Sequence, residues 1–431
     1  MAVQERLERL PYGLGRFTPA WYALAGVLLA LVALGAYAYL RQLIEGLIVT
    51  GLRDLGTMRG AAWGLYITFD IYFVGVSFAG ITMAALIRLL NLEALKPVSR
   101  MAELLTIIAL LLAGLVILPD LGQPLRGIVN LFVYARPQSP FFGTFTLVIA
   151  GYLFASLVYF YLDGRRDAAL CAQVPSRLQG FHRLWAAGYR DTPAERQRHA
   201  RTSFWLAIAI VPLLVTAHST LGFVFGLQVG RPGWFSALQA PGFVVMAGVS
   251  GIGLLLVVAA ILRRVLRLQE ELTPAVFAWL GRLLLLLIVI YLYFTAVELL
   301  TSLYAGHHHE VALTRALLVG EYSALYWVSM GSLVLALLLL VGQVALRAYS
   351  IPLLVLSGLL VNVAAIGKRY LIVVPSQTHG ALLPYGVGWY APTWVEYSII
   401  LGLFALGTFL YALFVKVFPI VEVPAVQGGK R

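Results

Sequence analysis

The sequence predicts an all-α, polytopic membrane protein with about ten transmembrane helices. Of its 431 residues, 61% are hydrophobic and only 12% are charged, whereas roughly 25% of the residues of a soluble domain are charged. Apolar runs of roughly 20 residues, the length needed to cross the hydrocarbon core of a bilayer, recur along the whole chain. These runs are too long and too uniformly apolar for the strands of a membrane barrel, so they are expected to be helices.

The segment before the first apolar run is charged, and no small-residue cleavage motif follows that run soon after. The first run is therefore expected to be a retained helix rather than a cleaved signal peptide. The expected spans lie near Ala20–Leu40, Ala62–Leu89, Met101–Leu118, Phe141–Leu162, Phe204–Phe225, Gly242–Leu262, Ala275–Tyr304, Tyr322–Val344, Ile351–Ile366 and Thr393–Phe418.

Basic residues predict the orientation, because Lys and Arg concentrate in cytoplasmic loops. With the N-terminus inside, 22 of the 31 Lys and Arg residues fall on the inner side and 9 on the outer side. Without the arginine-rich loop Asp163–Thr202 the inner excess remains, at 14 against 9. Both termini are therefore expected to be cytoplasmic. The net charge of +12 is expected to meet anionic lipid rather than nucleic acid, with that loop lying on the inner leaflet.

Two Gly-Val-Ser triplets indicate an internal repeat. The triplet at residues 75–77 is followed by Gly80, and the triplet at residues 248–250 is followed by Gly253. Both copies lie in spans that run from the outer to the inner side, so the repeat is parallel and predicts two four-helix bundles plus a flanking first and last helix. The expected units are an N-terminal segment with the first helix (1–61), a first bundle (62–225), a second bundle (226–375), and the last helix with an inner tail (376–431).

Asp70 and His218 are the first candidates for chemistry, since ionisable groups inside a bilayer are costly. Asp70 lies roughly 12 Å and His218 roughly 10 Å below the outer surface, at about 1.5 Å per residue. Tyr66 and Ser77 extend a polar stripe from Asp70. An acid and an imidazole at one depth suit a molecule that exchanges protons there, such as a quinone head group. The alternative is that both side chains bond to the backbone or to each other and fix helix packing.

Tyr291, Thr295 and Glu298 fall at helical spacing on one face of the seventh span. They form a candidate proton path near the outer side. An interhelical hydrogen-bond network is the alternative.

Four further charged residues stand at the outer ends of spans. Asp120 and Glu396 are expected to be solvated rim residues, although Asp120 could also close the outer mouth of a site. Lys368 and Arg369 are expected to anchor the ninth span at the outer interface.

The sequence predicts no metal site, haem or iron–sulfur cluster in this chain. Cys171 is the single cysteine, so four cysteines of this chain cannot ligate a cluster. Only His218 among the seven histidines falls inside an apolar run, which argues against a haem held by two histidines. The run His307–His309 before Glu310 resembles a metal cluster, but adjacent histidines in a loop are seldom a metal site.

Several motifs, in this order and spacing, resemble the NrfD/polysulfide-reductase family of membrane subunits. They are the segment Trp63–Tyr66, the segments 216–219 and 226–234, the segment Leu371–Ser376, and residues 392–396. The resemblance extends from about Trp63 to the C-terminal region and implies two four-helix bundles.

It also implies a substrate site for membrane quinone, menaquinone or ubiquinone, near the outer face of the first bundle. Asp70 and His218 match the depths and helices of the family's quinone-contacting groups, with Trp63, Ser77 and Asp120 around them. One departure is the carboxylate, because many members have histidine or asparagine near the level of Asp70. An iron–sulfur subunit on the outer, periplasmic face of the inner membrane and further catalytic subunits are the implied partners.

The predicted function is a quinone-binding membrane subunit of an iron–sulfur oxidoreductase complex. It would exchange electrons between quinone and the outer-face subunit. The sequence leaves open whether protons are also translocated. A secondary transporter is the alternative, because transporters also carry repeats and intramembrane ionisable residues. The parallel repeat and the polar groups near one face favour the quinone interpretation. A purely structural anchor is the third possibility.

Overall fold

The computed structural model describes residues 9–52, 60–134, 136, 138–139, 145–304, 306–379 and 387–423, and within these ranges it contains helices and no strands. Ten helical stretches are long and apolar enough to cross a membrane, as predicted. Their helices are α1 (Pro19–Glu45), α2 (Leu65–Val76) with α3 (Phe78–Leu89), α4 (Lys96–Asp120), α6 (Phe145–Cys171), α8 (Pro193–Gly226), α9 (Gln239–Val265), α10 (Pro274–Tyr304), α12 (Ser323–Ala345), α13 (Ile351–Val373) and α15 (Trp394–Val417).

The inner loop expected over Asp163–Thr202 is shorter in the structure. Helix α6 continues to Cys171, and α8 already begins at Pro193, where Thr192 and Glu195 form a capping box. Only the short helix α7 (Gln179–Ala186) and its flanking turns remain between them. The arginines that broke the apolar pattern therefore lie largely on helical extensions.

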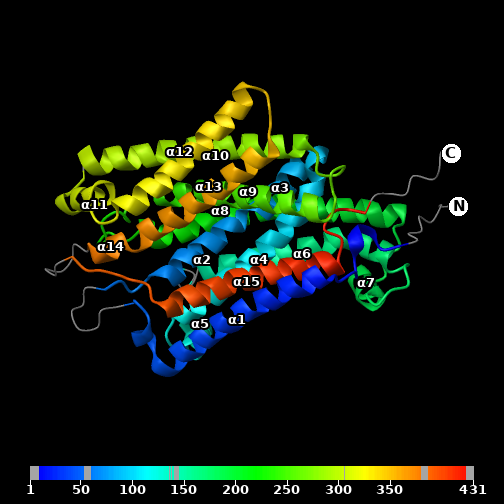
Figure 1. Cartoon of the computed structure of the whole chain (residues 1–431), viewed down its shortest axis with the longest axis horizontal. Helices are drawn as coiled ribbons and strands as arrows, with labels where there is room; N and C mark the ends of the chain where they lie inside the picture. The colour runs from blue at the N-terminus through cyan, green and yellow to red at the C-terminus, as the bar shows by residue number, and fades with distance from the viewer. Residues whose placement is uncertain are drawn as a thin grey trace.

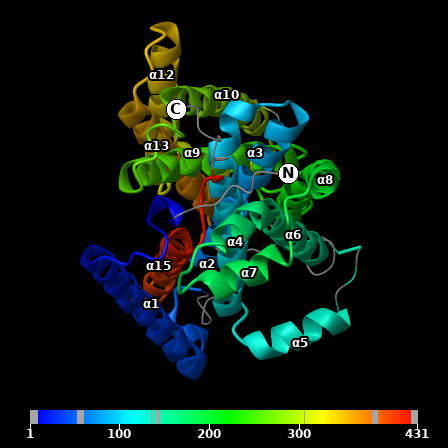
Figure 2. The same ribbon diagram turned by 90° about the vertical axis from the view of Figure 1, so that its right-hand side faces the viewer.

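Helix α9 lies at the centre of the bundle. It packs against α8, α2 and α3 on one side and against α10 and α13 on the other. Helices α1 and α15 run side by side along one edge, whereas α5 (Pro124–Tyr134) projects from the bundle (Figures 1 and 2). Helix α9 belongs to the expected second bundle but packs against α2, α3 and α8 of the expected first bundle, so the division into four units stays a prediction.

The two copies of the repeat meet each other. A Cβ atom added to Gly75 would lie 3.2 Å from Oγ of Ser250, and one added to Gly251 would lie 3.0 Å from the Val76 carbonyl oxygen. Small residues at these positions let α2 and α9 approach closely, as in many membrane helix pairs. The triplets that marked the repeat in the sequence therefore lie in the contact between α2 and α9.

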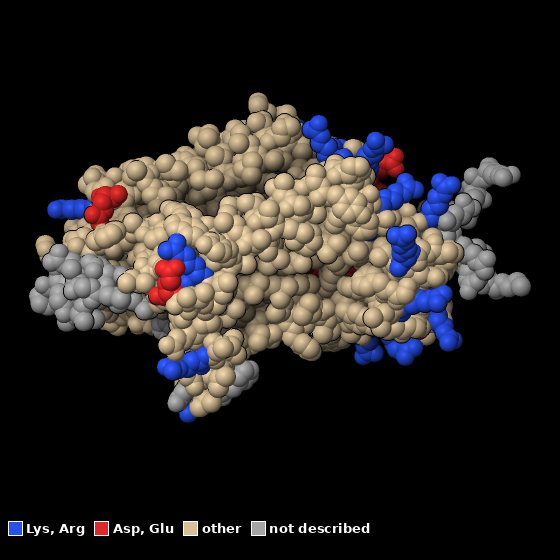
Figure 3. All heavy atoms as spheres, turned by 60° about the horizontal axis from the view of Figure 1, so that its bottom comes forward, with Lys and Arg blue, Asp and Glu red and all other residues tan. Residues whose placement is uncertain are grey.

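The start of α1 and the end of α15 lie at the same end of the bundle, which we call the terminal end; the opposite end is the distal end (Figure 1). Figure 3 shows Lys and Arg gathered at the terminal end and a broad belt almost free of charge beside it. Large apolar side chains such as Leu286 (56% exposed) and Leu338 (61% exposed) cover this belt. An uncharged apolar belt with charged ends is typical of a multi-pass membrane protein.

Substituting Gly402 by Leu is expected to separate α1 from α15 and to destabilise the chain by about 1–3 kcal/mol, the usual cost of overpacking. A Cβ atom at Gly402 would lie 2.9 Å from the Cα atom of Gly35, so the two backbones would have to move apart. The matched control is Gly342→Leu in α12, where nothing lies within 4 Å of the added atom. Thermal unfolding of the purified chain measures both, and equal melting temperatures would contradict the contact.

Candidate functional site

The Asp70 carboxylate is buried in α2, near the distal end. The residue is 4% exposed, and its Oδ1 atom has no hydrogen-bond partner among the described residues. Asp120, the last residue of α4, is close enough to act on it electrostatically. A buried carboxylate oxygen without a hydrogen bond is costly, so Asp70 has an unused capacity to accept a proton or a hydrogen bond.

Tyr66, one turn before Asp70, is fixed by its neighbours. Its hydroxyl donates to Oε1 of Gln42 on α1 at 2.6 Å, and Nε2 of Gln42 donates to the Pro119 carbonyl oxygen of α4 at 2.6 Å. This chain of hydrogen bonds joins α1, α2 and α4 beside Asp70. The Tyr66 hydroxyl therefore has a hydrogen-bond partner, whereas Oδ1 of Asp70 has none among the described residues.

His218 of α8 reaches the same helix as Asp70, one turn further along. It is 1% exposed; its Nε2 atom lies 2.9 Å from the Val74 carbonyl oxygen, and its Nδ1 atom lies 2.8 Å from the Leu214 carbonyl oxygen. A neutral imidazole carries one N–H and can donate to only one of these carbonyls, whereas a protonated ring can donate to both. The contacts agree with the packing role considered for His218, and they bring its ring against the backbone of α2.

The interruption between α2 and α3 at Ser77 is the centre of a buried polar network. The Ser77 carbonyl oxygen accepts hydrogen bonds from Oγ1 of Thr106 at 2.6 Å and from the Tyr152 hydroxyl at 2.8 Å. The Ser77 hydroxyl donates to the Val74 carbonyl oxygen, which His218 also contacts. Helices α2, α4, α6 and α8 thus meet through polar atoms at this level of the membrane.

Trp63 lies on another side of the site. Its ring stacks on Trp234 at 5.9 Å and meets Phe225 edge-on at 5.8 Å. Gln377 binds its backbone on both sides, because Oε1 accepts from the Trp63 N–H and Nε2 donates to the Trp63 carbonyl oxygen. Trp63 is therefore placed in an aromatic cluster at the distal end between the two halves.

The second half carries a separate polar cluster. Tyr291, Thr295 and Glu298 line a cavity of about 20 Å³ together with Lys368 and Arg369. The Lys368 ammonium lies 3.2 Å from Oε2 of Glu298. The expectation that Lys368 and Arg369 anchor a span at the interface is wrong, since Arg369 is 2% exposed and the Lys368 side chain, 15% exposed, is paired with Glu298.

Arg369 lies over the ring of Phe243, which the offset of 173 residues between the two Gly-Val-Ser triplets aligns with Asp70. Its guanidinium carbon is 4.2 Å from the ring centre of Phe243, a cation–π geometry. The two halves therefore differ in chemistry at this level, with a carboxylate in one and a ring under a cation in the other.

The expectation that Glu396 is a solvated rim residue is wrong, because Glu396 is fully buried. Its carboxylate accepts hydrogen bonds from the Gly51 N–H at 2.7 Å, from the Thr393 N–H at 3.0 Å and from the Tyr390 hydroxyl. Tyr390 also accepts from the Leu65 N–H, so Glu396 holds the start of α15 against the start of α2. Burial, and then the Glu396 carboxylate, raise the pKa of Tyr390.

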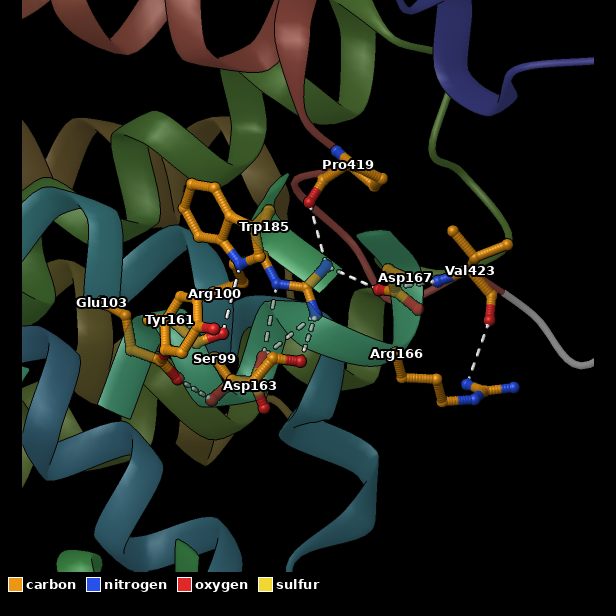
Figure 4. Close-up of polar contacts among 10 residues, drawn as sticks. All are labelled: Ser99, Arg100, Glu103, Tyr161, Asp163, Arg166, Asp167, Trp185, Pro419 and Val423. Carbon is orange, nitrogen blue, oxygen red and sulfur yellow. Dashed lines mark hydrogen bonds and ion pairs between the residues drawn. The ribbon is translucent and has the colours of Figure 1, made fainter. Parts of the chain in front are cut away.

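The terminal end contains charged groups that the sequence did not single out. Arg100, 2% exposed, donates to Oδ2 of Asp167 at 2.7 Å, to Oδ2 of Asp163 at 3.0 Å and to the Pro419 carbonyl oxygen at 2.9 Å (Figure 4). Asp167 in turn accepts from the Val423 N–H. Arg100 therefore binds α4, α6 and the C-terminal segment together, and it does not meet lipid as the charge count had assumed.

A polar path on α4 leads from this end towards Ser77. A cavity of about 350 Å³ beside Arg100 is lined in part by Ser99, whose hydroxyl donates to Oε1 of Glu103 at 2.7 Å. Glu103 is 3% exposed and precedes Thr106 by about one helical turn. The signal for Glu103 was present in the sequence, because it is an ionisable residue within the third apolar run.

Within the described part of the chain, no three His, Cys, Asp or Glu residues are placed to hold a metal ion. Glu310, which follows the histidine run, instead accepts a hydrogen bond from the Gly233 N–H at 2.8 Å. Cys171 is buried.

Comparison with known proteins gives consistent matches over most of the chain. The chain is 30% identical to a putative dimethyl sulfoxide reductase membrane subunit of Halobacterium salinarum, over the full length of both. It is 27% identical to a selenate reductase subunit of Mesobacillus selenatarsenatis, over 91% of this chain and 93% of that one. It is 25% identical to the Hdr-like menaquinol oxidoreductase integral membrane subunit of Archaeoglobus fulgidus, over 94% and 95%. Residues 54–381 match the polysulphide reductase, NrfD model, and the chain belongs to this family.

Proposed function

We propose that the chain is the quinone-binding membrane subunit of an oxidoreductase complex and that it exchanges electrons between menaquinone and an iron–sulfur subunit docked at the distal end. The observation that carries the proposal is the buried Asp70 carboxylate, with Oδ1 unpartnered among the described residues. The proposal is supported by the relative from Archaeoglobus fulgidus that is named as a menaquinol oxidoreductase subunit.

Asp70 is proposed as the group that takes a proton from the quinol hydroxyl. Oxidation of a quinol to a quinone releases two electrons and two protons, so a base must lie within hydrogen-bond distance of the hydroxyl. A carboxylate whose oxygen has no other partner in the described structure is suited to this role. Tyr66 and Gln42 hold α1 and α4 in place around it, and Asp120 is close enough to act on it electrostatically.

His218 is proposed as the second proton-carrying group. A neutral ring can donate to only one of its two carbonyls, so loss of a proton removes the hydrogen bond either to Leu214 or to Val74, whose carbonyl also accepts from Ser77. Ser99, Glu103 and Thr106 would carry protons between this network and the terminal end. Tyr291, Thr295 and Glu298 are proposed as a separate proton path in the second half.

The distal end is proposed as the docking face of the iron–sulfur subunit. Several apolar side chains outside the spans are exposed there, among them Val229 (75%), Phe235 (57%) and Trp389 (65%). Exposed apolar groups outside the lipid belt are typical of protein interfaces. The terminal end is rich in arginine and is proposed to face anionic lipid in the cytoplasmic leaflet.

A photo-crosslinking amino acid at Trp389 is expected to attach the iron–sulfur subunit in the native complex. The same amino acid at Leu184, an exposed apolar side chain (79%) of α7 at the terminal end, is the matched control and is expected to attach no such subunit. Mass spectrometry of the crosslinked products identifies the partner. Attachment at Leu184 but not at Trp389 would reverse the proposed docking face.

A further inference from the structure

An apolar groove of about 400 Å³ lies within the membrane belt, between the two halves of the protein. Helices α1, α2, α4, α9 and α15 form its walls. Lys416 is the one charged side chain among its described lining residues. Typical wall residues are Leu105, Leu112, Val258, Val265, Phe404 and Thr408.

The groove is open to lipid between α1 and α9. Helix α1 packs along α15 and makes few other contacts with the bundle, so it does not cover the opposite wall. On that wall, Ile261 is 54% exposed and Val265 is 67% exposed, although both line the groove. A hydrocarbon chain can therefore enter from the side without displacing any helix.

The mouth of the groove at the terminal end carries two polar donors. They are the ammonium of Lys416, at the end of α15, and the indole N–H of Trp21, at the start of α1. Within the described ranges, neither donor group has a side-chain or backbone acceptor. Arg264 stands next to the groove residue Val265 and adds positive charge at the same end.

We propose that this groove binds one anionic phospholipid of the leaflet at the terminal end. Its phosphate would accept hydrogen bonds from Lys416 and Trp21, and one of its acyl chains would lie along α15 as far as Phe404. The groove spans the twelve residues from Phe404 to Lys416, roughly 18 Å at about 1.5 Å per residue, which is close to the ~15 Å depth of one leaflet.

A phospholipid fits this groove better than the tail of a quinone. A quinone head group carries no charge, whereas the charged residue in the described lining is a cation at the lipid–water interface, where phosphates lie. The cation of the groove, Lys416, lies at the terminal end, whereas Asp70 lies towards the distal end. The bound lipid would fill the seam between α2 and α4 of the first half and α9 of the second half.

Native mass spectrometry of the full-length chain in mild detergent tests the site. We expect Thr408→Trp, which fills the groove, to lose one tightly bound phospholipid that the unmodified chain retains. Thr301→Trp is the matched control, because Thr301 is also exposed on a membrane helix and its hydroxyl bonds to the carbonyl four residues earlier, as that of Thr408 does. Equal phospholipid retention by both variants, or a quinone recovered as the retained molecule, would overturn the proposal.

A second variant tests the head-group contact and does not depend on packing. In titrations of the delipidated chain with phosphatidylglycerol, we expect Lys416→Gln to weaken binding roughly fivefold, as for one basic residue at a lipid surface. Arg282→Gln removes a charge near the same end, on α10 away from the groove, and should bind phosphatidylglycerol as the unmodified chain does. Equal affinity of all three proteins would overturn the proposed phosphate site.

Discussion

Replacing Asp70 by asparagine is expected to lower quinol oxidation by about 100-fold or more, the usual contribution of a general base. Asparagine keeps the volume of the side chain and one carbonyl acceptor, but it cannot take up a proton. Assembly of the complex should be unchanged, because Oδ1 of Asp70 makes no hydrogen bond that the substitution could remove among the described residues. Steady-state turnover with a soluble menaquinol analogue, measured on the purified complex, gives the result.

The comparison that isolates Asp70 is Glu310→Gln. Glu310 is a partly buried acid at the distal end, and its carboxylate accepts a hydrogen bond from Gly233 that a glutamine carbonyl can also accept. We expect its turnover to stay near that of the unmodified complex. If Asp70→Asn turns over at the same rate as Glu310→Gln, Asp70 is a packing residue and the proton acceptor lies elsewhere.

The ten spans could be predicted from hydropathy because lipid imposes a simple requirement on the chain. Each backbone group must be satisfied within its own helix, so every crossing needs a long apolar run, whatever its neighbours are. The position of Ser77 as a break between α2 and α3 could not be predicted in this way. It depends on Thr106 and Tyr152, which come from two other helices and bind the Ser77 carbonyl.

The direction in which a side chain points was harder to predict than its depth. In α2 almost every residue is buried, so hydrophobic periodicity does not separate a lipid face from a core face. The sequence placed Asp70 and His218 inside the membrane at a similar depth. It did not predict that the His218 ring would contact the Val74 carbonyl oxygen of α2. Depth follows from counting residues, whereas direction follows from packing.

Charged residues near span ends were misjudged for a related reason. Lys368, Arg369 and Glu396 each lie close to a predicted boundary, where a solvated residue is the usual expectation. In the structure Lys368 forms an ion pair with Glu298 of another helix. Glu396 accepts hydrogen bonds from Gly51, which is far away in the sequence, and from Tyr390, which lies in the loop before α15. Such pairings come from the tertiary arrangement, and a local pattern does not contain them.

Replacing Arg100 by methionine is expected to destabilise the chain by about 3–5 kcal/mol, the cost of leaving a buried charge without its partner. Both Asp163 and Asp167 would lose their guanidinium, and the Pro419 carbonyl would lose a donor. The C-terminal segment should then detach from α4 and α6 (Figure 4). Thermal unfolding measures the first effect, and limited proteolysis of the C-terminal segment measures the second.

Two comparison variants separate the buried charge from the loss of an arginine as such. Arg41→Met removes an arginine whose partner Glu45 is exposed, and an exposed pair contributes at most about 1 kcal/mol. The triple variant Arg100→Met, Asp163→Asn, Asp167→Asn also removes both stranded carboxylates and is expected to regain part of the lost stability, because uncompensated charge is the larger part of the cost.

If Arg100→Met unfolds at the same temperature as Arg41→Met, the three charges are hydrated and do not hold the terminal end together. If instead the triple variant is no more stable than Arg100→Met alone, the guanidinium acts through its packing and its contact with Pro419, and the two aspartates contribute little.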